Sequence, residues 1–199
     1  MIQTYDRTGT RAADITTDAL VVITASVAIA LLAQLSVPLW PVPITGQTLG
    51  VMAIAFLLGQ KRGVVAVALY LTYGALGLPV FANGSAGAGI FLGPTGGYLI
   101  GFLLAAVIVG SVADWQTKRN DRPDTRGSEW IAILALAAAF FVGTLVIYAT
   151  GVAHLAGFVG WDDAVRVGVA PFLVGDALKL AILVTAAAAV PRRDSTESS

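Results

Sequence analysis

The chain has 199 residues, of which 57% are hydrophobic and only 12% are charged. Soluble globular domains carry about 25% charged residues, so this composition excludes an ordinary soluble domain and indicates an integral membrane protein. Twelve basic residues balance twelve acidic ones, which argues against a nucleic-acid partner. The absence of cysteine excludes disulfides, thiolate metal sites and a cysteine nucleophile.

Six apolar stretches predict helices that cross the membrane. They cover about residues 19–35, 48–59, 63–77, 97–113, 129–150 and 169–190. The predicted fold class is therefore an all-α membrane protein, a six-helix bundle that forms one domain over residues 19–190. We expect residues 1–18 to be a polar N-terminal tail in the cytoplasm and residues 191–199 to be a disordered C-terminal tail.

The basic residues predict the orientation of this bundle. Ten of the twelve lie in the two tails, in the turn at Lys61 and Arg62, or in the polar linker 114–128. Only Arg166 falls on the other side, and Lys179 lies inside the last span. The positive-inside rule then places both termini in the cytoplasm of a multi-pass protein in the cell membrane.

Three loops, 36–47, 78–96 and 151–168, are predicted to face outward. The first two are too apolar for solvated linkers and too rich in Gly and Pro for regular helix. Irregular backbone at membrane depth is tolerated where protein buries it or where it lines a cavity. Aromatic side chains in and beside these loops suit either an interfacial belt or the walls of an apolar ligand pocket. They are Trp40, Phe81, Phe91 and Tyr98.

The last apolar stretch, Val169 to Val190, contains two charges, Asp176 and Lys179. Three residues on a helix place both side chains on one face, close enough to pair. A charge at bilayer depth costs at least about 2.5 kcal/mol, so such residues face a cavity or the interior of a bundle. Two interpretations remain open, namely an internal salt bridge that locks the last helix and a polar site for a small molecule. Asp176 is expected about 10 Å below the start of the helix, beneath the outward loops.

Two further features of the sequence could indicate a nucleotide site or a catalytic site. Gly93 to Gly97 (GPTGG) lacks the Lys-Ser/Thr ending of a phosphate loop, so it predicts a tight turn into the fourth span whose backbone amides could contact a polar ligand. His154 is expected in a loop after the fifth span, as an interface residue. Neither His154 nor Ser85 has a partner at the spacing of a catalytic site, although an intramembrane enzyme that uses Asp176 is a second class of function.

Four segments together resemble the BioY family, the biotin-specific capture subunits of energy-coupling-factor (ECF) transporters. They occur in the family's order over about residues 19–190: Pro41 to Thr48 (PVPITGQT), Gly77 to Ala82 (GLPVFA), Gly93 to Tyr98 with Gly101-Phe102, and Pro171-Phe172 with Gly175-Asp176 and Lys179.

The resemblance implies a six-helix S component that binds biotin from outside. It also implies a transmembrane coupling subunit and two cytoplasmic ATPase subunits as partners, with ATP used only by those partners and no cofactor or metal in this chain. The ligand-contacting acid falls on Asp176, the base on Lys179 and an asparagine on Asn83. Our candidate biotin-binding residues are Asp176, Lys179, Asn83, Tyr98, Thr45, Gln47, Gly93 and Thr95.

The chemistry of these residues also suits biotin, independently of the family resemblance. Asp176 can accept from the ureido N–H groups, and Lys179 can serve an oxygen of either the ureido ring or the carboxylate. The first span carries Ser26 and Ala30, which only approximate the Ala-x-x-x-Ala pattern that docks the coupling subunit in related proteins. A solitary biotin transporter that works without an ATPase module is the alternative function.

Overall fold

A computed structural model describes residues 7–120 and 129–189 of the chain. Almost all of them are helical, and the elements follow one another along the chain as α1 (Arg7–Gln34), β1 (Ser36–Val37), β2 (Ile44–Thr45), α2 (Gln47–Ala75), η1 (Ala82–Gly84), η2 (Ala88–Leu92), α3 (Gly96–Asn120), α4 (Glu129–Val159), α5 (Trp161–Gly168), η4 (Ala170–Phe172) and α6 (Leu173–Ala189). Five helical stretches in the described part are long and apolar enough to cross a membrane, ending with Trp161–Ala186, which joins α5 to α6. The predicted all-helical membrane fold is confirmed.

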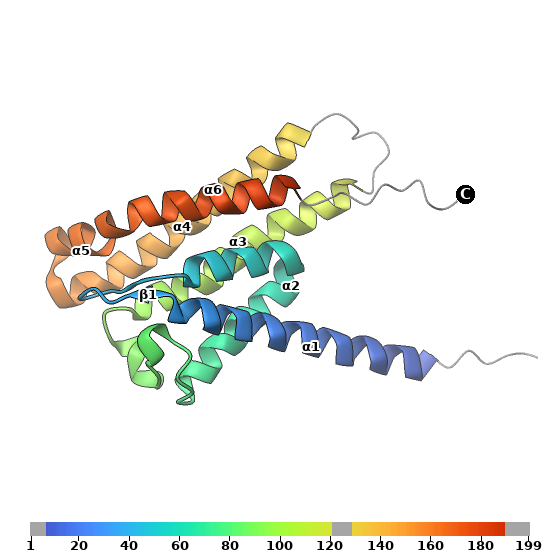
Figure 1. Ribbon diagram of the computed structural model, residues 1–199, viewed down its shortest axis with the longest axis horizontal. Coiled ribbons are helices and arrows are strands. Elements are labelled where there is room, and N and C mark those ends of the chain that lie inside the picture. Colours follow the sequence, from blue (N-terminus) through green and yellow to red (C-terminus); the bar gives the residue numbers. More distant parts are fainter. Residues whose placement is uncertain (1–6, 121–128, 190–199) are drawn as a thin grey trace, which may run out of the picture.

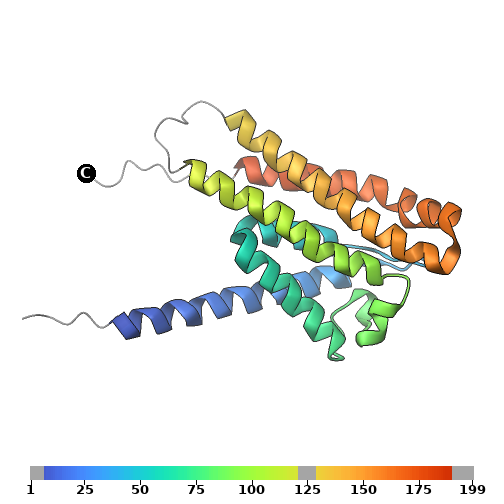
Figure 2. The same cartoon turned by 180° about the vertical axis from the view of Figure 1, so that it is seen from behind.

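The helices form a bundle in which α3 packs between α2 and α4 (Figures 1 and 2). Small residues allow this close packing. A side chain at Gly101 would meet the backbone of Ile147 on α4, and one at Gly110 would meet the backbone of Gln60. The core is apolar and includes Tyr70, Phe81, Phe102, Phe140 and other fully buried side chains.

The helix α2 is folded back on itself at Gly59, which has the positive φ of 74° that an L side chain rarely adopts. A side chain at Gly63 would lie 2.8 Å from the Cα of Ala55, whereas residues eight apart in a straight helix are separated by about 12 Å. The two halves are therefore the second and third spans that the sequence predicts, joined without a loop. Counted as a continuous element, they reduce the six predicted helices to five long ones.

The loops gather at one end of the bundle, which we call the loop end. Figure 1 shows β1, α5 and the segment between α2 and α3 at this end, whereas α3 ends and α4 begins at the opposite end. The first predicted outward loop forms a short antiparallel ribbon in which Ser36 pairs with Thr45 and Val37 with Ile44. The second forms the 3-10 turns η1 and η2.

Three boundaries in the second half of the chain differ from the sequence prediction. The fifth predicted span, 129–150, corresponds to α4, which continues to Val159. His154 therefore lies on α4 and not in a loop, and most of the predicted loop 151–168 is helical. A helix extends through the start of the polar linker, because α3 ends only at Asn120. The last long helix begins at Leu173 after the η4 turn at Pro171, which places Asp176 about 4.5 Å and not 10 Å below its start.

The helix α1 begins at Arg7, before the predicted span at residue 19. Ser26 is fully buried in the bundle and its hydroxyl donates to the carbonyl of Ile23 (2.7 Å). A buried side chain cannot be part of a free docking face, so this small residue serves the packing of α1 within the chain. Residues 7–18 of the predicted N-terminal tail are part of α1. Residues 1–6 of that tail, the linker segment 121–128 and the predicted C-terminal tail 191–199 lie outside the described residues.

Candidate ligand site

The paired charges of the last helix lie near its start, with Asp176 in the first turn of α6 and Lys179 in the second. The ammonium nitrogen of Lys179 stands 2.7 Å from Oδ1 of Asp176, as the three-residue spacing predicts. Both side chains are largely withdrawn from solvent, with 17% and 11% of their surfaces exposed. At this depth the pair must be satisfied by further polar groups, because an unpaired buried charge is strongly destabilising.

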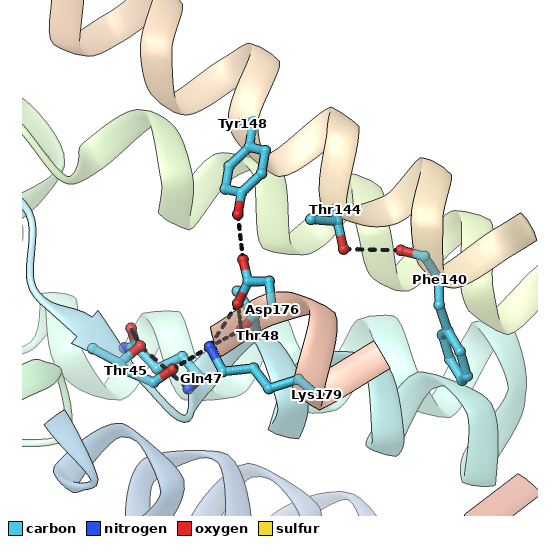
Figure 3. Close-up of polar contacts among 8 residues, drawn as sticks. All are labelled: Thr45, Gln47, Thr48, Phe140, Thr144, Tyr148, Asp176 and Lys179. Carbon is cyan, nitrogen blue, oxygen red and sulfur yellow. Dashed lines mark hydrogen bonds and ion pairs between the residues drawn. The ribbon is translucent and has the colours of Figure 1, made fainter. Parts of the chain in front are cut away.

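Those groups come from the beginning of α2 and the strand before it (Figure 3). Lys179 also donates to the backbone carbonyl of Thr45 (2.7 Å) and to the hydroxyl of Thr48 (2.9 Å), so all three of its protons have an acceptor. The Thr48 hydroxyl lies 3.5 Å from Oδ1 of Asp176. The pair therefore joins the last helix to the entry of the second one.

The second carboxylate oxygen of Asp176 is held from a third helix. Tyr148 on α4 points at it and donates its hydroxyl at 2.5 Å (Figure 3). Tyr148 is not among the site residues predicted from the sequence. The sequence shows only that a tyrosine lies within a largely apolar span. It does not show which face of the helix this tyrosine occupies.

Two more buried hydrogen bonds fix side chains near this cluster. The amide of Gln47 donates to the hydroxyl of Tyr70, and the side chain of Thr45 bonds both the backbone and the side chain of Gln47. Tyr98, at the start of α3, donates to the carbonyl of Gly168 at the end of α5 (2.9 Å). The walls are thus tied together by polar groups that link distant segments.

These groups surround a cavity of about 350 Å³ at the loop end of the bundle. Its volume lies within the range of about 300–1,000 Å³ that small-molecule sites occupy. All eight candidate residues of the sequence analysis line it. Thr48 and Tyr148 also line it, and most of the remaining wall is apolar, including Phe81, Ile90, Leu99, Phe102, Ile147 and Phe172. The structure thus brings together residues from both ends of the chain.

The four aromatic residues near the loops divide between the two predicted roles. Phe81 and Tyr98 are buried and line the cavity. Phe91 packs edge-on against Phe81, with 5.9 Å between the ring centroids, and supports that wall from behind. Trp40 is 83% exposed, which suits the interfacial belt.

Chemically, the cavity is an apolar chamber with one compact polar cluster. Lys179 and Asp176 neutralise each other, so the cluster offers hydrogen-bond donors and acceptors without a net charge. Such a site suits a ligand that has an apolar body and a neutral polar group at one end. Among the described residues no group of histidine, aspartate and glutamate is arranged to hold a metal ion.

The family of the chain follows from a comparison with known sequences. The model of the BioY family matches residues 5–195, nearly the whole chain. The chain belongs to the BioY family. The biotin transporter BioY of Thermotoga maritima is 41% identical over 75% of this chain and 81% of its own length. A probable biotin transporter BioY of Pyrococcus horikoshii is 40% identical over 76% and 82%. The resemblance drawn from the four segments is confirmed.

The fold agrees with a solved structure from this group. The crystal structure of the S-component for biotin from an ECF-type ABC transporter superposes with a TM-score of 0.74 at 24% sequence identity. It covers 88% of this chain and 91% of the other. At this identity the likeness shows the shared fold of an S-component.

Proposed function

We propose that this chain captures biotin from outside the cell and takes it up as the substrate-binding subunit of an ECF-type transporter. The observation that carries the proposal is the cavity, since an apolar chamber closed by a neutral Asp176–Lys179–Tyr148 cluster matches biotin chemically. The named relatives are biotin transporters, not enzymes, which sets aside an intramembrane enzyme that uses Asp176.

We assign the ureido ring of biotin to the polar cluster. This ring is uncharged and offers two N–H donors and one carbonyl acceptor. Asp176 would accept from the N–H groups. Lys179 or the Thr48 hydroxyl would exchange one of its present acceptors for the ureido carbonyl, and the long 3.5 Å bond from Thr48 to Asp176 is the weakest of these. A carboxylate would be a poorer fit here, because the positive charge of Lys179 is already matched by Asp176 at 2.7 Å.

The fused rings and the valeryl chain of biotin would then lie along the apolar wall made by Phe81, Leu99 and Phe172. Its carboxylate would reach toward the loop residues that line the cavity. Asn83 offers side-chain N–H donors there. The Ser85 hydroxyl and the backbone N–H of Gly93 donate to the carbonyls of Ala82 and Ile90, so they would have to exchange these acceptors for the carboxylate. In this arrangement all eight candidate residues remain proposed biotin contacts.

We further propose that the loop end faces outward and that both termini lie in the cytoplasm. The exposed basic residues Lys61 and Arg62 follow the fold of α2, and Lys118 lies near the end of α3. The loop end contains Arg166 beside the acidic Asp162 and Asp163. This asymmetry follows the positive-inside rule. Biotin would therefore enter from outside.

Transport would require partners that supply energy. The sequence has no nucleotide-binding motif of its own, so a transmembrane coupling subunit and two cytoplasmic ATPase subunits would drive release to the inside. The alternative is a solitary transporter, in which the bundle alone carries biotin down its gradient.

The test is binding of radiolabelled biotin to the purified chain in detergent without ATP. We expect saturable binding of one biotin per chain and no hydrolysis of ATP. Reconstitution into vesicles with and without the coupling module then separates the two modes of transport, because only the module should make accumulation dependent on ATP. Absence of saturable biotin binding would contradict the proposal.

A further inference from the structure

The loop that closes the cavity, residues 78–95 between α2 and α3, is held by two side chains that do not line the cavity. This 78–95 loop supplies much of the wall, including Phe81, Asn83 and Ile90. Its backbone follows only short 3-10 turns, η1 and η2. A segment with so little regular structure needs tertiary contacts to keep one conformation.

The first of these side chains is Gln34, at the end of α1. Its amide nitrogen donates to the backbone carbonyls of Val80 (3.2 Å) and Phe81 (3.1 Å), and its amide oxygen accepts from the backbone N–H of Gly84 (3.1 Å). The two N–H groups of Gln34 are shared with a third carbonyl, that of Ala30 on α1 (3.1 Å). One side chain therefore contacts three backbone groups in and beside η1, in which Asn83 adopts a positive φ of 57°.

The neighbouring Ser36 extends this attachment to a cavity residue. Its hydroxyl donates to Oδ1 of Asn83 at 2.7 Å. With its oxygen engaged, the Asn83 side chain keeps its two N–H donors free for other acceptors. The end of α1 thus sets both the backbone and the side-chain orientation of a residue that lines the cavity.

The second side chain is His154 on α4, which contacts the other end of the loop. Its Nε2 lies 3.0 Å from the carbonyl oxygen of Gly93, and because a carbonyl only accepts, Nε2 carries the proton. The same carbonyl accepts from the N–H of Gly96 and so closes the turn into α3. A side chain at Gly97 would lie 2.5 Å from Cβ of His154, so the helix start sits directly against it.

We propose that Gln34 and His154 are positioning residues that hold the 78–95 loop over the cavity and thereby set how long a bound ligand stays. The predicted effect on biotin release rests on the proposed function. The attachment of the loop to Gln34 and His154 does not depend on it. Opening of the loop would break the bonds to Gln34, the bond to His154, or both. Loss of either residue should therefore speed opening and the release of biotin.

The test compares biotin dissociation rates and backbone hydrogen exchange in matched variants of the full chain. A neutral hydrogen bond contributes about two- to twelve-fold to an equilibrium constant. We expect Gln34→Met, which loses three bonds to the loop, to speed biotin dissociation about tenfold, and His154→Leu about threefold. Both variants should also speed hydrogen exchange in residues 78–95 without biotin.

Conservative variants separate a specific attachment from general loosening. His154→Gln keeps an N–H donor at the reach of Nε2 and should restore slow dissociation, whereas His154→Asn is one bond shorter and should not. Gln34→Glu keeps the acceptor for Gly84 but loses both donors, and we expect an intermediate rate. Gln116→Met is the control, because Gln116 makes a similar bond to the carbonyl of Ala132 (2.7 Å) far from the cavity.

Exchange in the 78–95 loop that stays at the wild-type rate in both Gln34→Met and His154→Leu would overturn the attachment. Unchanged biotin dissociation in both, or an equal increase in Gln116→Met, would overturn its role in retention. If the wild-type chain itself fails to bind biotin, the proposed function falls, and the exchange data still decide whether the two residues hold the loop.

Discussion

At the scale of single residues, the site depends on how Asp176 is satisfied. Its two oxygens accept from different helices, one from Lys179 on its own helix and the other from Tyr148 on α4. A carboxylate offers about four lone-pair positions, so Oδ2 can still accept from a ligand, and Oδ1 can do so when Thr48 turns away from it. Tyr148 therefore orients the proposed acceptor without consuming it.

Tyr148→Phe tests this role. The substitution removes one hydroxyl and keeps the ring, so the Asp176 carboxylate loses a donor and its fixed orientation. Hydrogen bonds to charged groups contribute about 1.5–3 kcal/mol, and we expect biotin to bind at least tenfold more weakly. Equilibrium binding of labelled biotin measures the effect.

The matched control for that experiment is Tyr73→Phe. Tyr73 lies on α2 and does not line the cavity, so its loss of a hydroxyl should leave biotin affinity unchanged. Wild-type affinity in Tyr148→Phe would show that Asp176 needs no donor from α4.

At the scale of elements, the fold of α2 at Gly59 decides where the site lies. The sharp reversal brings the two halves of α2 together, and the N–H of Gln60 at the start of the second half donates to a carboxylate oxygen of Asp114 on α3 (3.2 Å). The first half, which begins at Gln47, is thereby fixed with Thr48 beside the cavity.

Gly59→Ala should destabilise the protein. The position needs a positive φ, and an added Cβ would lie 2.0 Å from an oxygen of Asp114. We expect a loss of at least about 1–2 kcal/mol, seen as a lower midpoint of thermal unfolding in detergent. Gly157→Ala is the control, because no atom beyond its own turn of helix lies within 4 Å of that added methyl and its φ is not in the left-handed region. Equal midpoints for the two variants would contradict this role of Gly59.

The sequence predicts these elements well where composition alone decides them. Every apolar stretch assigned as a span is helical, because about 20 apolar residues leave a helix as the way to satisfy the backbone in lipid. The prediction is wrong at the loop end, where a loop was expected but α4 continues to Val159 with Val152 and Leu155 buried on one face. Hydropathy does not distinguish an apolar loop from a helix whose buried face packs on α5.

The candidate site was predictable to the extent that it rests on motifs. All eight chosen residues line one cavity, because the motif segments Pro41 to Thr48 and Gly93 to Tyr98 are the loops that surround it. Tyr148 was missed, since its position depends on the rotation of α4 about its axis. The hydrogen bonds of Gln34 and His154 could not be predicted either, because their partners are backbone groups of a distant loop.

At the scale of the whole molecule, capture of biotin from outside requires one orientation in the membrane. The chain contains no cysteine, so single cysteines report sidedness directly. Ala86→Cys in the 78–95 loop should react with an impermeant thiol reagent added to intact cells, and Lys61→Cys at the opposite end should react only after the cells are permeabilised. Both positions are exposed. Labelling of both from the same side would contradict the proposed topology.

The proposed function depends on the Asp176–Lys179 pair binding the ligand and not merely locking α6 to α2. The most direct measurement is a paired determination of thermal stability and biotin affinity for Asp176→Asn, Lys179→Met and the double variant. Each single change strands a buried group and should destabilise the fold, by about 3–5 kcal/mol where a charge is left unpaired. The double variant should regain much of that stability yet bind biotin roughly tenfold to 150-fold more weakly, because the charged acceptor for the ureido ring is gone. A stable double variant with wild-type affinity would mean that the pair is structural and that biotin binds elsewhere.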